Sequence, residues 1–552
     1  MATHYLYGFS IQGIQSFIFE TNKLREIVGG SEFVEQACEF KFLEAFEAIG
    51  GFKKEQRIVN AAGKVVYLFK DKSNCKHIVK HFLRGLKREI PDLNASQAVI
   101  RLEGTFDSNT LFQLDALLEA QRNKKPQAHG AGWMISGRAR RTGKAGIKID
   151  EKFESTDDRI HVIDRSQVAK EKYKAYGNES LMIKFSSRPD VIFEESNLPL
   201  EVDNITKGRE PAWLAIVHTD GNGLGRTIQK LISHSKEKGH EVEKKLSLFS
   251  KQLKKATKQA AQRAFKASVW DTFQQEGGKF LPMRPILLGG DDLTILLRGD
   301  LAFDFTRLYL EYFEEETTRA LAELGPDFLK DGLTACAGIA YIKPHYPIHY
   351  GVDLAESLTK HSKKIAKDMA RQHGKNTIPP AALAFHKVQS SFIEKDYNKI
   401  VERELTVGSD DNSISFDFGP YFLNGEQRYI LPTLDNKDKR QEDQEYVVYP
   451  SIRQLEQWVE IIQKEDAPKA RLRNWLSELH ESEASAEQLL KRIRSLTRMR
   501  YIEDLHLDYP FGKNNGLQQR ARIKQKLYCN QSKLPQSYRV THLYDVLSLA
   551  SI

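Results

Sequence analysis

Short apolar runs alternate with turns around residues 285–297. Two such runs, 285–288 and 293–297, flank the four positions Gly289-Gly290-Asp291-Asp292. Apolar runs on either side of a glycine-containing turn predict a β-hairpin. The glycines give the turn backbone freedom, and the aspartates place two carboxylates at its tip. Taken alone, the same stretch is equally typical of a surface hairpin with an acidic turn.

An earlier stretch ends in similar chemistry. Residues 213–219 form an apolar, β-branched run that is followed by Asp220-Gly221-Asn222-Gly223-Leu224-Gly225. The pattern predicts a buried strand with a carboxylate at its end, followed by a glycine-rich turn into a helix, where backbone N–H groups can approach an anion. If this strand lies beside the hairpin, Asp220 converges on Asp291 and Asp292.

The same order of elements occurs nearer the N-terminus. Residues 6–19 predict a strand that turns into a helix, with a small-residue break at 29–31 before a helix over 32–49. The hairpin predicted over 57–69 matches 289–297 in its turn and apolar pattern, and Gln12-Gly13 takes the place of Asp220-Gly221. We interpret this as a duplicated unit with carboxylates only in the second copy. The alternative is that any two strand–helix units look alike at this level.

The remaining pattern predicts an α+β chain of several domains, because 552 residues exceed a single core. Helices are expected over 75–89, 111–122, 164–176, 227–275, 303–324 and 352–371, and strands over 97–103, 333–341, 413–418 and 427–431, with linkers at 186–210 and 435–445. We expect a degenerate first domain (1–122), a basic linker and helical domain (123–205), a catalytic domain (206–390), a β-containing connector (391–450) and a C-terminal helical domain (451–552).

Charge favours an acidic partner, since the formal net charge is +9. A dense basic cluster within a glycine-rich stretch offers candidate RNA-binding residues, which are Arg138, Arg140, Arg141 and Lys144. A solvated charge run is the alternative. Lysines of the predicted helical region 227–275 are expected mostly on exposed helix surface, with some facing RNA.

Cysteine usage and hydropathy narrow the class of protein. The four cysteines, Cys38, Cys75, Cys336 and Cys529, form no CxxC pair, so neither a disulfide framework nor a zinc knuckle is expected. No apolar run is long enough to cross a membrane, and the N-terminus lacks the pattern of a signal peptide. The sequence therefore predicts a cytoplasmic protein without a membrane partner.

Three carboxylates at one point repel one another, so the pattern predicts one or two divalent ions, Mg²⁺ or Mn²⁺. Asp220, Asp291 and Asp292 are the candidate catalytic and metal-binding residues, with Gly221 also at the metal site. Such ions support in-line transfer from a nucleoside triphosphate. Candidate nucleotide-binding residues are the turn residues and two lysines of the helix predicted over 352–371: Gly221, Asn222, Gly223, Gly289, Gly290, Lys360 and Lys363. An ordinary soluble helix face is the alternative for the lysines.

These motifs together resemble a known family over roughly residues 5–375. The unit with Gly289-Gly290-Asp291-Asp292 is similar to the ferredoxin-like palm of nucleotide cyclases, and specifically to the large polymerase-like subunit of type III CRISPR effector complexes. That subunit has two palm-like units, of which the first is degenerate. Its motifs resemble the runs 13–18, 24–31 and 337–340 of this chain, and its lysine-bearing helix resembles residues 354–363.

Two departures from the family pattern matter. No His-Asp dipeptide occurs, so the resemblance is to a variant without the HD nuclease domain, and cleavage of single-stranded DNA is not expected. The region around residues 138–143 has arginines where many members carry a cysteine zinc motif, so no zinc is expected.

The resemblance implies synthesis of cyclic oligoadenylate second messengers from ATP with two Mg²⁺ or Mn²⁺ ions. It also implies a subunit of an RNA-guided complex, with guide and target RNA as partners and small subunits on the C-terminal helical domain. In this interpretation the acidic palm holds a donor nucleotide and the degenerate palm an acceptor. Two alternatives stay open, namely a free-standing palm-type cyclic dinucleotide synthase and an inactive scaffold subunit. Three clustered carboxylates argue against the scaffold, because folding alone gives no reason to keep them together.

Overall fold

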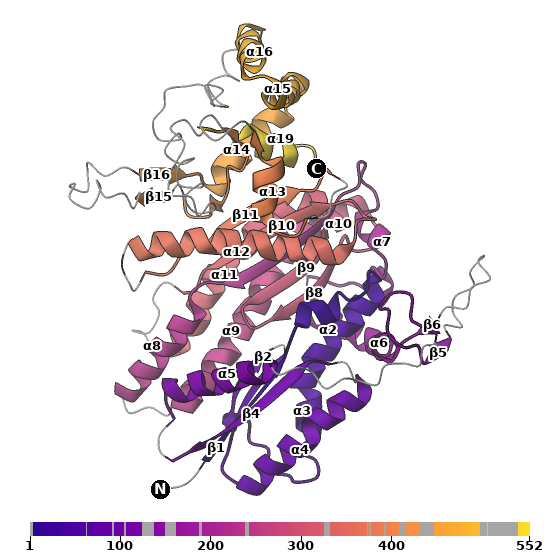
Figure 1. Cartoon of the computed structure of the whole chain (residues 1–552), viewed down its shortest axis with the longest axis vertical. Coiled ribbons are helices and arrows are strands. Elements are labelled where there is room, and N and C mark those ends of the chain that lie inside the picture. The colour runs from indigo at the N-terminus through magenta and orange to yellow at the C-terminus, as the bar shows by residue number, and fades with distance from the viewer. Residues whose placement is uncertain are drawn as a thin grey trace.

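The computed structural model of the chain (Figure 1) describes residues 4–552 apart from a set of short and long gaps. The gaps are 62, 91–92, 104–105, 124–136, 150–161, 187–189, 238–241, 325–331, 373, 375–376, 391–393, 408–413, 426, 431–445, 497–504 and 506–538. The linker expected at 435–445, much of the basic stretch after residue 123, and most of 497–538 therefore lie outside the described residues. Within them, no helix has both the length and the apolar character needed to cross a bilayer.

The first unit is a four-stranded antiparallel sheet covered by helices. Its strands are β1 (His4–Ile11), β2 (Arg57–Ala61), β3 (Lys64–Phe69) and β4 (Ala95–Leu102), in the order β2-β3-β1-β4. Its helices are α1 (Ile14–Ile18), α2 (Leu24–Cys38), α3 (Phe40–Glu44), α4 (Lys72–Glu89) and α5 (Ser108–Arg122), with a 3-10 turn η1 at Lys54–Gln56. The hairpin predicted over 57–69 is confirmed, and Gly63 at its turn has a φ of 81°.

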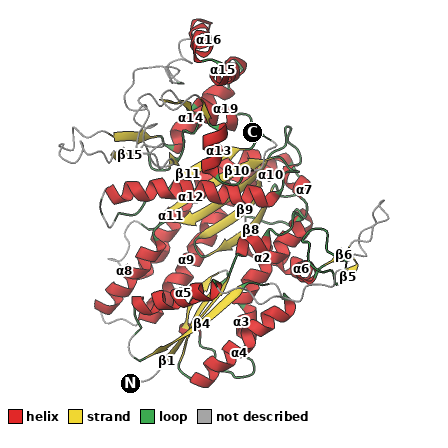
Figure 2. Ribbon diagram, in the orientation of Figure 1, coloured by secondary structure: helices red, strands yellow, loops and turns green. Residues whose placement is uncertain are grey.

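The second unit is a six-stranded sheet in the order β14-β11-β10-β7-β9-β8. Its strands are β7 (Leu214–Gly221), β8 (Met283–Gly289), β9 (Asp292–Arg298), β10 (Ala335–Ile342), β11 (Ala382–Lys387) and β14 (Tyr421–Phe422). Its helices include α8 (Leu224–Glu237), α9 (Val242–Ala264), α10 (Asp271–Glu276), α11 (Gly299–Leu321) and α12 (Ile348–Gln372), with a π-helical segment η3 (Phe265–Trp270) and a 3-10 turn η4 (Ala322–Leu324). Figure 2 shows both sheets flanked by helices.

The duplication predicted from sequence is confirmed by the topology, since β8-β9-β7-β10 repeats the order β2-β3-β1-β4. The predicted equivalence of Gln12-Gly13 with Asp220-Gly221 is wrong by two residues. Ser10 of β1 pairs with Ser96, the second residue of β4. Asp220 of β7 pairs with Cys336, the second residue of β10, and β10 is the strand equivalent to β4. Strand pairing therefore places Ser10 at the position of Asp220.

The glycines after these strands confirm the corrected alignment. Gly13 and Gly223 both have positive φ, 59° and 72°, and each directly precedes a helix. Only residues that tolerate the left-handed region can make this turn cheaply. The counterpart of Gln12-Gly13 is therefore Asn222-Gly223.

A second expectation fails at Gly29-Gly30, where a break was predicted before a helix over 32–49. The chain instead continues as one helix, α2, and then as the short α3. A Cβ on Gly29 would lie 1.8 Å from the main-chain oxygen of Lys170 in α6 (Arg165–Phe185). The glycines therefore serve close helix packing and do not form a turn.

Helix α9 lies between the two hairpins and contacts both. Ser247 donates to the main-chain oxygen of Arg57 at 3.0 Å, and Thr257 donates to that of Gly290 at 2.7 Å. Among the lysines expected mostly on exposed surface, Lys245 is half-buried and donates to the main-chain oxygen of Leu324. Lys254 of α9 is half-buried as well and pairs with Glu39 of the first unit, whereas Lys251 and Lys255 are exposed as expected. These contacts join the units.

The linking segment and the C-terminal part complete the fold. The former contains β5 (Lys148–Ile149), β6 (Val162–Ile163), α6, η2 (Glu195–Asn197) and α7 (Val202–Thr206). The latter contains α13 (Tyr397–Glu404), β12 (Thr406–Val407), β13 (Ile414–Ser415), β15 (Gln427–Ile430), β16 (Tyr446–Tyr449), α14 (Ile452–Gln463), α15 (Lys469–Glu481), α16 (Glu483–Leu496), β17 (Arg539–Val540) and α19 (Leu543–Leu549).

The C-terminal part is less separate than expected. Strand β14, from the predicted connector, joins the sheet of the second unit beside β11. Strand β17, from the predicted helical domain, pairs in parallel with β13 of the connector. In Figure 1 the C-terminal helices lie at the top, above α12 and the strands β10 and β11.

Candidate active site

The three aspartates meet at one edge of the second sheet. Asp220 is near the end of β7, Asp291 is in the turn between β8 and β9, and Asp292 begins β9. Their carboxylate oxygens lie within 4.8 Å of one another. The antiparallel pairing of β7 with β9 produces this meeting, because it aligns Thr219 with Leu293, the residue after Asp292. The convergence expected from sequence is therefore present.

Gly221 leaves the space that this cluster requires. A Cβ at position 221 would lie 2.8 Å from both Cβ and Oδ2 of Asp291, closer than real Cβ atoms come. The backbone N–H of Gly221 also donates a hydrogen bond to the Asp291 carboxylate. A glycine is thus needed here for close approach.

Burial and mutual repulsion disfavour the charged form of two of the carboxylates. Burial, reinforced by the negative charge of Asp220, raises the pKa of Asp291 to about 6. Burial and the charges of Asp291 and Asp220 raise the pKa of Asp292 well above its usual range. The ammonium of Lys363 opposes both shifts. A cation at this point would relieve the repulsion.

Lys363 contacts the carboxylate cluster, whereas Lys360 does not. Nζ of Lys363 in α12 is 2.5 Å from Oδ2 of Asp220 and 2.6 Å from the main-chain oxygen of Gly221. Lys360 points to solvent with 76 % of its side chain exposed, and its ammonium is 3.5 Å from Glu356. The two lysines proposed for nucleotide binding therefore occupy different environments.

The remaining turn residues shape the edge of the sheet. Asn222 is buried, and its Nδ2 donates to Oγ1 of Thr334 at 3.0 Å and to Sγ of Cys336 at 3.3 Å. The side chain of Asn222 therefore ties the turn to β10. Gly290 has a φ of 67°, as the tip of the hairpin requires.

A cavity of about 550 Å³ opens between the two units beside this edge. Gln12, Gly13 and Lys64 line it from the first unit, and His218 and Asp292 line it from the second. The position of Asp292 in this cavity gives a ligand access to the carboxylate cluster from the first unit.

Sequence reasoning missed His218 and Glu356, which also line the cavity. His218 is two residues before Asp220 on one strand, so alternation along β7 places both on the same face. Burial lowers the pKa of His218 to about 4, and its Nδ1 is 2.9 Å from Oγ1 of Thr294. Strand alternation could have identified His218, whereas Glu356 depends on where α12 packs.

The equivalent edge of the first unit lacks the carboxylates. Pairing of Ala61 with Lys64 corresponds to pairing of Gly289 with Asp292, so Gly63 and Lys64 replace Asp291 and Asp292. Nζ of Lys64 is 2.9 Å from Asp115 in α5. A lysine at the position of Asp292 makes a divalent-metal site in the first unit unfavourable.

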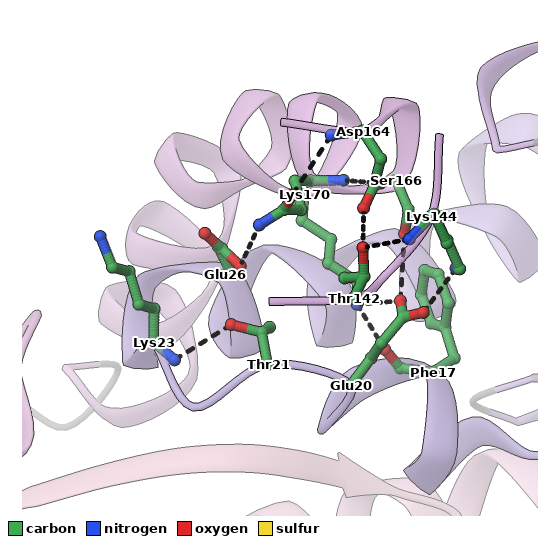
Figure 3. Close-up of polar contacts among 11 residues, drawn as sticks. Phe17, Glu20, Thr21, Lys23, Glu26, Thr142, Lys144, Asp164, Ser166 and Lys170 are labelled. Atoms are coloured by element: carbon green, nitrogen blue, oxygen red, sulfur yellow. Dashed lines mark hydrogen bonds and ion pairs between the residues drawn. The ribbon is translucent and has the colours of Figure 1, made fainter. Parts of the chain in front are cut away.

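The basic cluster expected to face RNA is partly neutralised by the first unit. Arg141 pairs with Glu26. Lys144 pairs with Glu20 at 2.5 Å (Figure 3). Arg138 and Arg140 are exposed. Of the four residues expected to bind RNA, Arg138 and Arg140 are therefore the two whose side chains are fully accessible to it.

Glu20 also accepts a contact from Lys170, whose ammonium lies 3.3 Å away and donates to the main-chain oxygen of Phe17 (Figure 3). Lys170 is almost fully buried, and burial lowers its pKa. The network around Glu20 thus fastens the linking segment to the first unit.

The residues at the acidic edge suit a divalent metal. They supply hard carboxylate oxygens, which Mg²⁺ and Mn²⁺ prefer, at distances that one ion can bridge. Lys363 supplies one positive charge against three carboxylates, so a negative balance remains for a cation. Asp220, Asp291 and Asp292 are the residues that would hold it.

Comparison with known proteins agrees with this architecture. Residues 213–378 match the family model of the Cas10/Cmr2 second palm domain. No curated protein sequence matches the chain.

Similar solved structures come from Csm1–Csm4 cassettes. A chain of the cassette in complex with cA4 matches all of this chain and 70 % of its own length, with 12 % identity and a TM-score of 0.50. A chain of the cassette with AMPPNP matches 66 % of this chain and 53 % of its own length, with 12 % identity and a TM-score of 0.41. A chain of the apo cassette matches all of this chain and 70 % of its own length, with 13 % identity and a TM-score of 0.46.

This chain thus spans about half of the solved chain from the AMPPNP-bound cassette and seven tenths of the other two. The likeness to the cA4-bound structure is one of fold, which fits two palm domains with helical regions. The matched segment contains all three aspartates and Lys363. Residues 213–378 match the second palm domain of the Cas10/Cmr2 type, and the fold of the chain is similar to that of a chain from a Csm1–Csm4 cassette.

Proposed function

We propose that this chain is a metal-dependent nucleotidyltransferase that makes cyclic oligoadenylates from ATP, as the large subunit of an RNA-guided type III CRISPR complex. The observation that carries the proposal is the meeting of Asp220, Asp291 and Asp292 within 4.8 Å at the open edge of a Cas10/Cmr2-type palm. Divalent ions held by these carboxylates would supply charge neutralisation for a triphosphate and activation of a 3′-hydroxyl.

The protein's own groups would orient the nucleotide. Lys363 places a buried positive charge beside the carboxylates, where it can contact the outer phosphates. Because Gly223 and Gly290 have no side chains, a nucleotide could approach the backbone closely at both positions. Lys360, which is exposed on the same helix, offers a second and more mobile charge.

The cavity between the units supports an asymmetric pair of nucleotide sites. The donor triphosphate belongs at the acidic edge, and the acceptor belongs on the side lined by Gln12, Gly13 and Lys64. Lys64 there offers a cation to a phosphate in place of the carboxylate of Asp292. The first unit would then bind and position a nucleotide without catalysing transfer.

Two further observations support the type of product and the setting. A solved structure of similar fold comes from a Csm1–Csm4 cassette, so its chain is assembled with another subunit, and that structure is a complex with cA4. We extend this to the present chain as a proposal, with guide and target RNA and small subunits as partners. The C-terminal helices are the proposed contact for the small subunits.

The test is product analysis. The chain is purified alone and with the RNA and subunits that co-purify, incubated with ATP and Mg²⁺, and assayed for pyrophosphate and for cyclic products by mass spectrometry. We expect both products, and a D291N/D292N variant should form them about 100-fold more slowly. The exposed Asp203 in α7 gives the matched control D203N, which should match the wild type.

Equal yield from D291N/D292N and wild type would reject the assignment of the site. Ring size separates the proposed product from that of a free-standing cyclic dinucleotide synthase, since the mass of the product states the number of nucleotides directly.

A further inference from the structure

A second cavity, of about 960 Å³, lies at the joint between the second palm sheet and the C-terminal helices. The sheet contributes Trp213, Lys343 and Lys387, which lie at the ends of neighbouring strands. Helix α15 contributes Arg473 and His480. The connector and α19 close it with Phe416, Tyr544, Ser548 and Ser551. Its volume is in the range of cavities that hold a small organic ligand.

This cavity is separate from the acidic edge. Trp213 precedes the first residue of β7 and Asp220 is near its last, so about 23 Å of extended strand lies between them. Likewise, Lys343 directly follows β10, whose other end pairs with Gly221. A ligand in this cavity cannot contact the carboxylate cluster.

Positive charge gathers in the cavity without a matching carboxylate. Its lining includes Lys343, Lys387 and Arg473 and contains neither Asp nor Glu. Burial, together with the charges of Lys343 and Arg473, lowers the pKa of Lys387 to about 8. Glu404 reaches the rim, where Ser390 donates to it at 3.4 Å, but it also pairs with Arg403. The cavity therefore favours an anion.

Within the part of the chain that the structure describes, the fold supplies hydrogen-bond acceptors for only one of these three cations, Lys387. Lys387 donates to the main-chain oxygens of Ser548 and Ser551 at 3.4 and 3.3 Å, which suits a cation at the C-terminal end of α19. Lys343 and Arg473 have no carboxylate partner among the described residues, and both are exposed. Their charges remain available to a ligand.

Aromatic rings lie beside the cations. The ammonium groups of Lys343 and Lys387 lie 3.8 and 4.4 Å from the centroid of the Trp213 ring. Phe416 contacts the rings of His480 and Tyr544, with centroids 5.2 and 5.9 Å apart. Trp213 and Phe416 are buried, whereas His480 is exposed and Tyr544 is half-buried, so the latter two present their rings to the cavity. Accessible rings next to Lys and Arg are the combination that binds a base together with its phosphate.

We propose that this cavity binds a phosphorylated nucleotide, with its phosphate held by Lys343, Lys387 and Arg473 and its base packed on the aromatic rings. The nucleotide is either a free small molecule or the phosphorylated end of an RNA, and both present the same chemistry. This site is additional to the nucleotide sites between the palms and does not depend on their proposed activity.

The test measures nucleotide binding to the full chain in EDTA, which removes divalent metal from the acidic edge. AMP and ATP are titrated by calorimetry, and quenching of tryptophan fluorescence gives a second readout because Trp213 lines the cavity. The double variant K343A/R473A changes two exposed side chains, so its fold is retained. We expect its Kd for AMP to rise about tenfold or more.

A control on the same helix separates this cavity from other sites. R471A removes an exposed arginine of the same helix that does not line the cavity. It should keep the wild-type Kd within about twofold. A K343A/R473A variant with wild-type affinity would overturn the proposal, as would the absence of saturable binding up to about 1 mM nucleotide.

Further arms identify the ligand. If inorganic phosphate displaces AMP as strongly as AMP itself binds, the rings contribute nothing and the nucleotide class is wrong. An RNA oligonucleotide with a 5′-phosphate that binds about tenfold more tightly than AMP, and more tightly than the same RNA without the phosphate, assigns the site to an RNA end. Equal or weaker binding of that RNA assigns it to a free nucleotide.

Discussion

The ammonium of Lys363 lies 2.5 Å from Oδ2 of Asp220, so α12 places a positive charge directly on the carboxylate cluster of the second palm. Packing of α12 on β10 fixes this charge. A Cβ on Gly338 would lie 2.2 Å from the main-chain oxygen of Ala355, so the helix rests on the bare backbone of that strand. The helix is also held by Thr359, which donates to the main-chain oxygen of His218 at 3.0 Å.

Replacing Lys363 should separate metal binding from turnover. In K363M we expect pyrophosphate release from ATP to fall roughly 100-fold, because a buried charge beside the phosphates is lost. Mn²⁺ should bind at least as tightly as in wild type, because a competing cation has left Asp220. K360M removes an exposed lysine from the same helix and should change the rate less than about threefold. Equal losses in both variants would contradict the assigned role of Lys363.

Gly221 should be intolerant of a methyl group. In G221A the new Cβ would meet Asp291 at 2.8 Å and displace a carboxylate, so Mn²⁺ affinity should fall about tenfold or more. Gly225, at the start of α8, has open space around it, so G225A should bind Mn²⁺ normally. Calorimetric titration of both variants is the measurement, and unchanged affinity in G221A would show that the close approach is not required.

The corrected view of Gly29 makes a prediction about stability. G29A should lower the free energy of unfolding by about 3 kcal/mol, because the methyl group would overlap the main-chain oxygen of Lys170. Gly85 in α4 is a matched control with nothing within 4 Å, and G85A should stabilise by about 0.5–1 kcal/mol. Urea unfolding of the two variants is the measurement. If Gly29 formed a turn, as the sequence predicted, a methyl group would not meet α6 and G29A would not lower the free energy of unfolding in this way.

His386 should make the protein less stable in acid. Burial lowers its pKa to about 4, against about 6.5 in the unfolded chain, with Glu404 and Asp417 opposing the shift. Protonation therefore favours the unfolded state, and stability present above pH 6.5 is lost as pH falls towards 4. The loss is on the order of 3 kcal/mol. The free energies of unfolding of wild type and H386Q, measured by urea titration between pH 7 and 4, should diverge by this amount, and parallel curves would contradict the prediction.

Local pattern was sufficient for much of this fold. Alternation of apolar runs and glycine turns predicted both hairpins, because a hairpin depends on residues close together in the chain. The meeting of Asp220 with Asp291 and Asp292 was predicted on the condition that their strands are neighbours, and the pairing of β7 with β9 meets that condition. The topology then confirmed the duplication. Of these features, the hairpins are the part that short-range sequence determines.

Long-range packing decided the rest. The equivalence of Ser10 with Asp220 follows from pairing with β4 and β10, which no local pattern displays. The glycines of α2 have the sequence pattern of a turn, and only their contact with α6 explains why they lie within a helix. The partners of Arg141 and Lys144 are glutamates of the first unit, far from them in sequence. Sequence therefore predicted the charges but not what neutralises them.

The central claim is that one palm binds metal and the other does not. Electron paramagnetic resonance of Mn²⁺ titrated into the full chain counts bound ions without requiring turnover. We predict one or two saturable ions per chain in wild type, none of these in D291N/D292N, and an unchanged number in S10A, whose residue takes the position of Asp220 in the first unit. A D291N/D292N variant that binds as many ions as wild type would contradict the account.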